Sequence, residues 1–246
     1  MPNRLVVALL VATAMALGAA GCVRQRTTVT QIGAMRAVMR EGQSEPRANL
    51  RAMTATPAMY GVGAMAGLDG EVTIHDGEVW ITRVKDGTPV TTGPVPAASE
   101  QATLLTFGPV ARFQNHVLIS SLSGEALEQA IREAAARDGI DARRPFLFTL
   151  HGKATSMRMH VVDGTCLHAD PTAPGLRLEI AEPTAVEIVG VHAEGQAGVM
   201  THHGTSVHMH ALLEWHGQPL TAHVDSAAMA PGATLSIPAD MESASP

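Results

Sequence analysis

Three histidines in the C-terminal part of the chain, His208, His210 and His223, have a spacing that predicts a metal site. Residues two apart in a strand point to the same face of the sheet, so His208 and His210 would lie side by side. His216-Gly217 is suited to a two-residue turn, because glycine readily adopts a positive φ. That turn would place His223 opposite His210, with Cβ atoms about 4.5–5.5 Å apart. The three imidazoles would then converge on one face of a hairpin.

This arrangement predicts a bound metal ion, Zn²⁺ or another late divalent metal. Neutral imidazole is a favoured zinc ligand, and three protein ligands with an open position are typical of a catalytic site. An alternative is that three of the chain's 12 histidines lie on a solvated strand. A one-residue slip in register would turn His223 to the other face, and Pro219 makes a bulge near the turn conceivable.

Composition limits the classes of fold and partner. The chain has 246 residues, enough for one large domain or two small lobes. Its formal net charge is −6 and it has no basic run, so we expect no nucleic-acid partner. Aromatic residues make up only 3%, so aliphatic residues and 13 methionines must fill the core.

Residues 1–22 are typical of a bacterial export signal. Arg4 precedes an apolar run over residues 5–17, which is too short to cross a membrane comfortably. The small residues before Cys22 resemble a lipobox, which predicts a protein anchored to a bacterial membrane by lipid on Cys22, on the periplasmic or cell-surface side. Membrane contact would be through the lipid alone. An ordinary signal peptide cut nearby is the alternative.

Cys166 is the second of two cysteines, and the mature chain offers it no disulfide partner. We expect a buried structural thiol, because the sequence shows no base that would activate it as a nucleophile.

The remaining pattern predicts a mixed, strand-rich α/β fold with few short helices packed on sheets. A short amphipathic helix is expected over residues 31–40, and a longer helix follows the N-cap Ser123 and ends at Gly139. Asp76-Gly77 and Asp86-Gly87 are hairpin turn signals. Strands are expected in the following segments: 71–74, 78–82, 101–107, 116–119, 146–150, 156–162, 176–180, 185–192 and 233–237.

Several segments, in this order, resemble the bacterial α-acetolactate decarboxylases. The N-terminal signature is carried by Gly61-Val62-Gly63, Leu68-Asp69-Gly70-Glu71 and Asp76-Gly77-Glu78-Val79-Trp80. The zinc motif of that family resembles His208-Met209-His210 followed by Ala222-His223-Val224. The resemblance extends over roughly residues 28–238 and includes the strand at residues 187–191.

The resemblance implies a two-lobed fold of mixed sheets and the conversion of 2-acetolactate to acetoin and CO2. It implies zinc held by His208, His210 and His223, and a proton-handling role for Glu71. It also implies a small 2-hydroxy-3-keto acid as the partner, and a homodimer by analogy. We expect a tether and helix at 23–45, an N-terminal lobe at 46–163 and a C-terminal metal-binding lobe at 164–246.

Two departures from the family pattern affect the substrate end of the site. His160 stands where the family has an arginine, and Arg158 is two residues away on the same face of the strand. Either could bind the substrate carboxylate, although a histidine forms fewer hydrogen bonds than a guanidinium. The family also carries a second glutamate on a C-terminal extension, for which Glu242 is the remaining candidate.

The polar residues near these motifs also have interpretations without a functional role. Glu71 could be a solvated hairpin residue, and His160 an ordinary strand histidine. His202 and His203 are expected to be exposed in a glycine-rich loop, although one of them could reach the metal. Asp225 could orient a ligand or simply be solvated.

Two further functions therefore remain beside the decarboxylase. One is a related lyase acting on another small 2-hydroxy or 2-keto acid, as the replacement by His160 suggests. The other is a non-catalytic lipoprotein that binds a metal or a small ligand.

Overall fold

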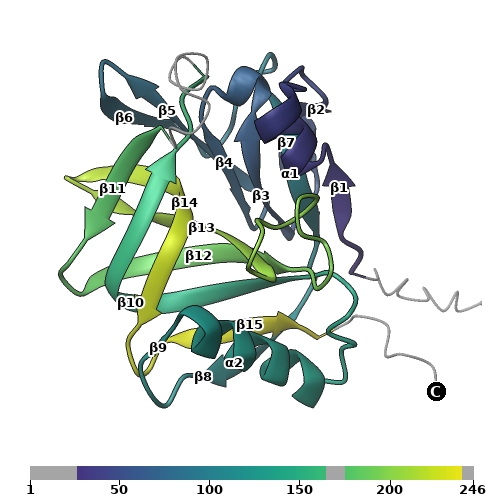
Figure 1. Ribbon diagram of the computed structural model, residues 1–246, viewed down its shortest axis with the longest axis vertical. Helices are drawn as coiled ribbons and strands as arrows, with labels where there is room; N and C mark the ends of the chain where they lie inside the picture. Colours follow the sequence, from purple (N-terminus) through teal and green to yellow (C-terminus); the bar gives the residue numbers. More distant parts are fainter. Residues whose placement is uncertain (1–26, 165–174, 240–246) are drawn as a thin grey trace, which may run out of the picture.

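The computed structural model describes residues 27–164 and 175–239, and confirms a strand-rich α/β fold with two sheets and few helices (Figure 1). The predicted signal segment with Cys22, and the residues Cys166 and Glu242, lie outside the described ranges.

The first sheet, called sheet A, has seven antiparallel strands in the order β1-β7-β3-β4-β5-β6, and β2 also pairs with β7. Its turns follow the sequence prediction: Asp76 and Gly77 have φ of 50° and 80°, and Asp86 and Gly87 have φ of 50° and 73°. The strands are β1 (Thr30–Ile32), β2 (Ala48–Asn49), β3 (Met59–Met65), β4 (Glu71–His75), β5 (Glu78–Lys85), β6 (Thr88–Thr92) and β7 (Gln101–Pro109).

The second sheet, called sheet B, has eight strands in the order β8-β15-β10-β12-β13-β14-β9, and β11 also pairs with β10. The strands are β8 (Phe113–Val117), β9 (Leu122–Ser123), β10 (Phe146–Val161), β11 (Leu176–Ile180), β12 (Thr184–His192), β13 (Val207–Trp215), β14 (Gln218–Met229) and β15 (Thr234–Pro238).

Strand β10 closes part of sheet B into a ring. It is one continuous strand where the sequence predicted two, because Gly152, whose φ of 154° suits glycine, still pairs with Val186 of β12 and does not interrupt it. Residues 146–154 pair with β12, whereas residues 154–160 pair with β14. Since β12 also pairs with β13, and β13 with β14, the four strands β10, β12, β13 and β14 form a closed circuit.

The histidine hairpin has the register predicted from the sequence. His210 pairs with His223 and Trp215 with Gln218, with no register slip at Pro219. His216 and Gly217 form the turn with φ of 50° and 77°. The two-residue period and the turn chemistry were therefore sufficient to place these side chains.

Two α-helices in the described part of the chain accompany the sheets. α1 spans Met35–Glu41, shorter than the predicted 31–40 helix, because Thr30–Ile32 pair with β7 as strand β1. α2 spans Gly124–Arg137 and buries Leu127, Ile131, Ala134 and Ala135, although Ser123 makes no side-chain cap. Two 3₁₀ segments, η1 (Leu50–Ala55) and η2 (Ala66–Leu68), lie in sheet A connections. Within the described ranges, no helix is long and apolar enough to cross a membrane.

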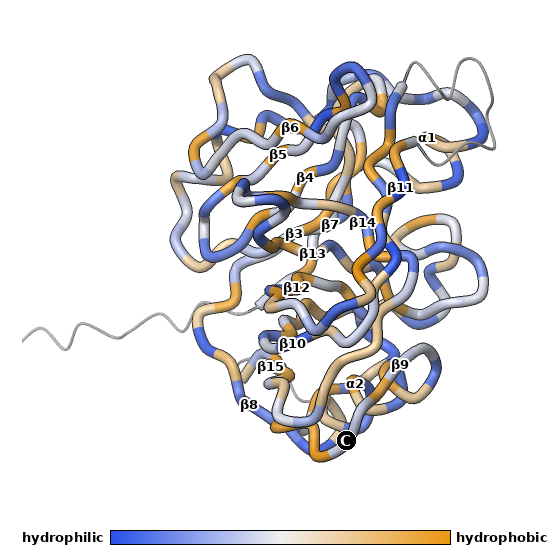
Figure 2. Tube along the Cα trace, turned by 90° about the vertical axis from the view of Figure 1, so that its left-hand side faces the viewer, coloured by the Kyte–Doolittle hydropathy of each residue, from blue (hydrophilic) through white to orange (hydrophobic). Residues whose placement is uncertain are grey.

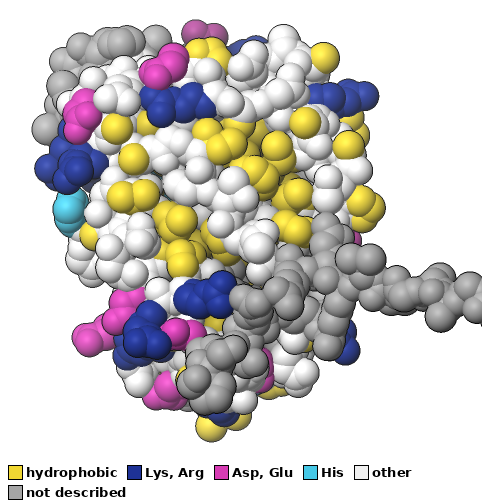
Figure 3. Space-filling view, turned by 90° about the vertical axis from the view of Figure 1, so that its right-hand side faces the viewer, with side chains coloured by type: hydrophobic (Ala, Val, Ile, Leu, Met, Phe, Trp, Pro, Cys, Tyr) yellow, Lys and Arg dark blue, Asp and Glu magenta, His cyan; other side chains and the backbone are white. Residues whose placement is uncertain are grey.

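The two sheets pack face to face through β3 and β4 of sheet A and β12 and β14 of sheet B. Figure 2 shows hydrophobic residues concentrated on the strands and hydrophilic residues in many peripheral connections. The largest apolar cluster fills sheet B and includes α2. Figure 3, viewed from the side of β1, β7 and α1, shows hydrophobic side chains spread over this face, with charged groups mostly towards its margins.

The predicted boundary between residues 163 and 164 does not separate the two sheets. β10 precedes that boundary, yet it pairs with β11, β12, β14 and β15 and belongs to sheet B. The chain passes from sheet A to sheet B between Pro109, which ends β7, and Phe113, which begins β8. The boundary between the two sheets is therefore set by the pairing of the long strand β10 and not by the loop that follows it.

Gly190 on β12 allows Phe148 of β10 to lie across it beneath the histidine hairpin. The two residues are cross-strand partners, Phe148 is fully buried, and a Cβ on Gly190 would lie 2.4 Å from the Phe148 Cζ atom. We expect Gly190→Ala to lower the free energy of unfolding by about 1–3 kcal/mol through overpacking. Urea unfolding measures the loss. Combining Gly190→Ala with Phe148→Leu should cost less than the sum of the two single changes, and strict additivity would contradict the contact.

Candidate metal centre

A row of histidines crosses three neighbouring strands of sheet B. His210 on β13 pairs with His223 on β14, and His223 pairs in turn with His160 on β10. His208 lies two residues along β13 from His210, on the same face. The closure of β10 onto β14 therefore adds a fourth imidazole to the three that the sequence grouped.

His208, His210 and His223 present nitrogen atoms that lie within 4.8 Å of one another. The Nε2 atoms of His208 and His210 face each other at 3.2 Å, and all three side chains are buried. Two neutral imidazoles at this distance can share one N–H, or with both nitrogens deprotonated they can bind one cation. A site of three neutral imidazole nitrogens suits Zn²⁺ and other late divalent metals, so the residues fit the expected metal.

Burial keeps these three imidazoles neutral, which is the form that binds metal. It lowers the pKa of His208 to about 3, and the charge of His202 adds to the effect. Burial, followed by the charge of His208, also holds the pKa values of His210 and His223 well below the ordinary value. A metal therefore competes with few protons at neutral pH.

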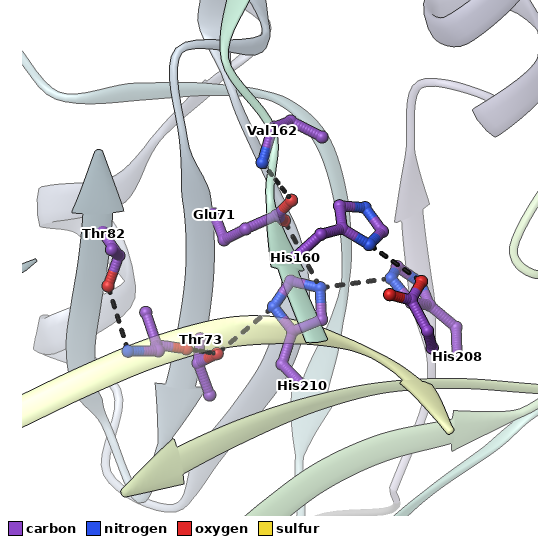
Figure 4. Close-up of polar contacts among 9 residues, drawn as sticks. Glu71, Thr73, Thr82, His160, Val162, His208 and His210 are labelled. Atoms are coloured by element: carbon purple, nitrogen blue, oxygen red, sulfur yellow. Dashed lines mark hydrogen bonds and ion pairs between the residues drawn. The ribbon is translucent and has the colours of Figure 1, made fainter. Parts of the chain in front are cut away.

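Threonine hydroxyls from both sheets support the back of His210. Thr73 Oγ1 on β4 lies 3.3 Å from His210 Nδ1 and also contacts Thr221 Oγ1 on β14. The Thr221 backbone N–H donates to Thr82 Oγ1 on β5 at 3.0 Å. All three threonines are buried (Figure 4). Engagement of Nδ1 by Thr73 leaves Nε2 of His210 directed at the cluster, as a metal ligand requires.

Glu71 brings a carboxyl group from sheet A to the cluster. It is 3% exposed, which excludes the solvated hairpin alternative. Its Oε1 accepts a hydrogen bond from the Val162 N–H at 3.1 Å, and its Oε2 lies 3.6 Å from His210 Nε2 (Figure 4). Burial raises the pKa of Glu71 to about 7, although the nearby charge of His160 and the hydrogen bond from Val162 act in the opposite direction. Glu71 can therefore both hold and release a proton near neutral pH.

His160 is buried and is oriented by Asp225. Its Nδ1 lies 2.8 Å from Asp225 Oδ1. Asp225 occupies a β-bulge, because Arg158 pairs with Ser226 while the next residue, Met159, already pairs with Val224. Burial acts to lower the pKa of His160, but the hydrogen bond with Asp225 and the charge of Glu71 outweigh it and raise the pKa. Asp225 thus supports His160, which the sequence alone did not indicate.

Arg158 is placed differently from the sequence expectation. Its side chain is exposed, and its Nε donates a hydrogen bond to Ser226 Oγ at 3.1 Å. It lines a surface hollow with Arg177, Glu179 and Asp225, apart from the three clustered histidines. Of the two predicted candidates for the arginine position, only His160 lies in the cluster, because Arg158 is exposed beside its strand partners Glu179 of β11 and Ser226 of β14.

His202 lies closer to the cluster than expected for a residue in a glycine-rich loop. Its ring stands edge-on to His223 at 4.9 Å and to His208 at 6.2 Å, measured between ring centroids. Burial and then the charge of His160 lower its pKa. The neighbouring His203 is exposed, as predicted.

A cavity of about 320 Å³ opens beside the cluster. Its polar lining includes His160, His202, His223 and Asp225, and its apolar lining includes Leu127 and Ile131 of α2. The volume is at the lower end of the roughly 300–1,000 Å³ of typical ligand sites, which suits a small molecule.

Comparison with solved structures places this arrangement in a known fold. α-Acetolactate decarboxylase from Bacillus subtilis strain 168 superimposes with a TM-score of 0.66 at 17% identity, over 87% of each chain. The enzyme from Bacillus subtilis subspecies spizizenii gives 0.65 at 16% identity, over 85% of each chain. This chain has the α-acetolactate decarboxylase fold.

A third structure agrees with this assignment. A Staphylococcus aureus protein of unknown function, described as similar to α-acetolactate decarboxylase, gives a TM-score of 0.62 at 16% identity over 85% of this chain and 84% of that chain. No protein-family profile matches the sequence, and no curated protein matches it at the sequence level. The likeness to acetolactate decarboxylases is therefore one of fold.

Sequence reasoning missed the contacts of His202 and the partner of Asp225. His202 belongs to a loop between two strands, where no periodicity fixes the direction of a side chain. Asp225 follows His223 by two residues, so alternation placed both on one face, but the bulge carries its carboxylate to His160. The sequence did carry one signal for the contact of His202 with the cluster: His202 and His203 stand only a few residues before His208 and His210.

We expect Thr73→Val to weaken metal binding by about 10-fold, because His210 loses the contact that orients its ring. The free energy of unfolding should fall by about 1–3 kcal/mol, since Thr221 also loses a partner. Zinc titration against a competing chelator and urea unfolding measure the two effects. Thr103→Val is the matched control: Thr103 is equally buried in sheet A but donates to the Gln43 carbonyl, so its loss should leave metal affinity unchanged.

The folding stability of the metal-free protein should depend on pH through its buried histidines. Because the folded-state pKa of His208 is about 3 against an ordinary 6.5, the unfolded state binds more protons between these values. Stability from this group is therefore full above pH 6.5 and falls as the pH drops, by about 1.4 kcal/mol per pH unit. Glu71, with its raised pKa, acts in the opposite sense between its ordinary value of 4.5 and about 7.

Comparison with His208→Gln isolates this contribution. Urea unfolding of both metal-free proteins between pH 7 and pH 5 should show a smaller acid loss in the variant. Equal pH slopes would contradict the neutral state of His208.

Proposed function

We propose that this protein is a zinc-dependent decarboxylase that converts 2-acetolactate to acetoin and CO2. The observation that carries the proposal is the buried triad His208, His210 and His223 with the protonatable Glu71 beside it, on the acetolactate decarboxylase fold. Bound zinc would supply a Lewis acid that stabilises negative charge on the substrate oxygens. The proposed ligands are the three histidines, and Cys22 is the proposed lipid attachment site.

Glu71 is the proposed proton donor. When CO2 leaves a 2-hydroxy-3-keto acid, the electron pair of the broken C–C bond remains with the substrate, and a proton must be added to give the hydroxyketone. Glu71 has a pKa near 7 because it is buried between the sheets, so a large fraction is protonated at neutral pH. Its hydrogen bond from Val162 fixes the carboxyl in the site.

His160 is the proposed partner of the substrate carboxylate. Its contact with Asp225 at 2.8 Å engages Nδ1 and leaves Nε2 free to face a ligand. A histidine offers fewer donors than the fork of an arginine. This difference favours the second candidate function, a lyase acting on a related small 2-hydroxy or 2-keto acid. A metal- or ligand-binding lipoprotein without turnover is the further alternative.

Export and assembly are also proposals. Residues 1–22 support secretion and lipid attachment at Cys22, which would hold the folded part at a bacterial membrane surface. A homodimer is proposed by analogy with the fold family. The small-molecule acid is the proposed partner, and the absence of a basic run argues against nucleic acid.

The direct test is acetoin formation from racemic 2-acetolactate by zinc-loaded residues 23–246. We expect acetoin with the wild type, none with His208→Ala, and a rate at least about 100-fold lower with Glu71→Gln, which keeps the shape of the side chain but cannot supply the proton. Zinc binding by Glu71→Gln should persist. Zinc bound by the wild type with no acetoin would reject acetolactate as the substrate.

A panel of small 2-hydroxy and 2-keto acids then separates the other candidates. Turnover of another acid would support the related lyase. Metal binding without turnover of any of them would support the non-catalytic role.

A further inference from the structure

The connection between β12 and β13, residues 193–206, is far longer than a hairpin turn and is fixed at both of its flanks. The Ala193 N–H donates to the Ser206 carbonyl at 2.8 Å and closes its base. From α1, the backbone N–H groups of Met35 and Arg36 donate to the carbonyls of Val199 and Gly198, at 3.0 and 2.7 Å. The loop therefore has a defined path over the edge of the histidine cluster.

Helix α2 fixes the other flank through Glu128. One carboxylate oxygen accepts from Thr205 Oγ1 at 2.7 Å and the other from the Ser206 N–H at 3.0 Å. Within the loop, Thr201 is fully buried and donates to the Thr205 carbonyl at 3.1 Å. His202 lies between the residues that bond to α1 and those that bond to α2, so the backbone is fixed on both sides of it.

The position of His202 differs from that of a fourth metal ligand. Its ring is edge-on to His208 and His223. Two groups of described residues present possible ligand atoms within 4.8 Å of one another, His208 with His210 and His223, and His160 with His223 and Asp225, and neither includes His202. His202 instead lines the 320 Å³ cavity, together with His160, at the end nearest the triad. Glu71 contacts the triad at a different member, His210.

We propose that His202 is a substrate-positioning residue, which hydrogen-bonds a small hydroxy acid bound at the triad and is held there by Glu128. This inference rests on the proposed metal site and adds a residue from the β12–β13 loop to it. An imidazole at the boundary between metal and cavity can donate one N–H to a carboxylate or hydroxyl oxygen. His160 would contact the same ligand from β10, so two imidazoles would define its orientation.

The test uses the Co²⁺-loaded protein, residues 23–246, and the unreactive acid 2-hydroxy-2-methylpropanoate as the probe. Co²⁺ affinity and the visible absorption spectrum report on the metal ligands, and the spectral change on titration reports on the probe. We expect His202→Ala to bind Co²⁺ within threefold of the wild type, with an unchanged spectrum, but to bind the probe at least about 10-fold more weakly, as for a lost hydrogen bond to a charged group.

Three variants control the interpretation. His216→Ala removes an exposed imidazole that does not line the cavity and should leave probe binding unchanged. His202→Asn keeps one N–H donor and should recover part of the affinity. Glu128→Ala releases the loop without touching His202, so probe binding should weaken while Co²⁺ binding is retained, and it provides the test should His202→Ala not fold.

Other outcomes would overturn the inference. If His202→Ala and Glu128→Ala both bind the probe as the wild type does, His202 does not position the ligand. If His202→Ala loses Co²⁺, it is a metal ligand instead, and if the wild-type spectrum does not respond to the probe, no such subsite exists. Failure of acetoin formation with the expected probe results would reject the proposed substrate while leaving the role of His202 intact.

Discussion

The packing of sheet A onto the histidine face of sheet B is the constraint on which the rest of the structure depends. Four imidazoles lie on or beside this face, and burial would be costly for any of them that was charged and unpaired. The structure meets this cost by keeping His208, His210 and His223 neutral and by pairing His160 with Asp225. The same burial that makes the triad neutral also makes it able to bind metal.

Sheet A covers the histidines and also contributes polar side chains to the site. Glu71 reaches the cluster from β4, and Thr73, two residues along the same strand, supports His210 from behind. A strand places alternate residues on one face, so one strand supplies both the acid and the support. Burial that depresses the pKa of the histidines raises that of Glu71, because in each case the neutral form is favoured. One environment thus favours both the neutral imidazoles that a metal site needs and the protonated form of Glu71.

The closure of sheet B into a ring decides which further polar groups lie beside the three clustered histidines. β10 turns from β12 to β14 along its length, and this brings His160 beside His223. The bulge at Asp225 then directs a carboxylate to His160, while Arg158 remains exposed and donates to Ser226. The two helices fix the loop that carries His202. The proposed substrate contacts are therefore distributed over β4, β10 and the β12–β13 loop, while the proposed metal ligands lie on one hairpin.

The sequence by itself determined the histidine hairpin, because a two-residue period and the turn His216-Gly217 are local and fix the register across the turn. It also determined the strand-rich class, the two other hairpin turns and helix α2, all of which follow from short-range patterns. Tertiary structure alone decided that Glu71 is buried, that Asp225 serves His160 and that His202 meets the cluster. Those contacts join residues up to 139 positions apart, between His210 and Glu71, and depend on how the sheets close and pack, which no local pattern encodes.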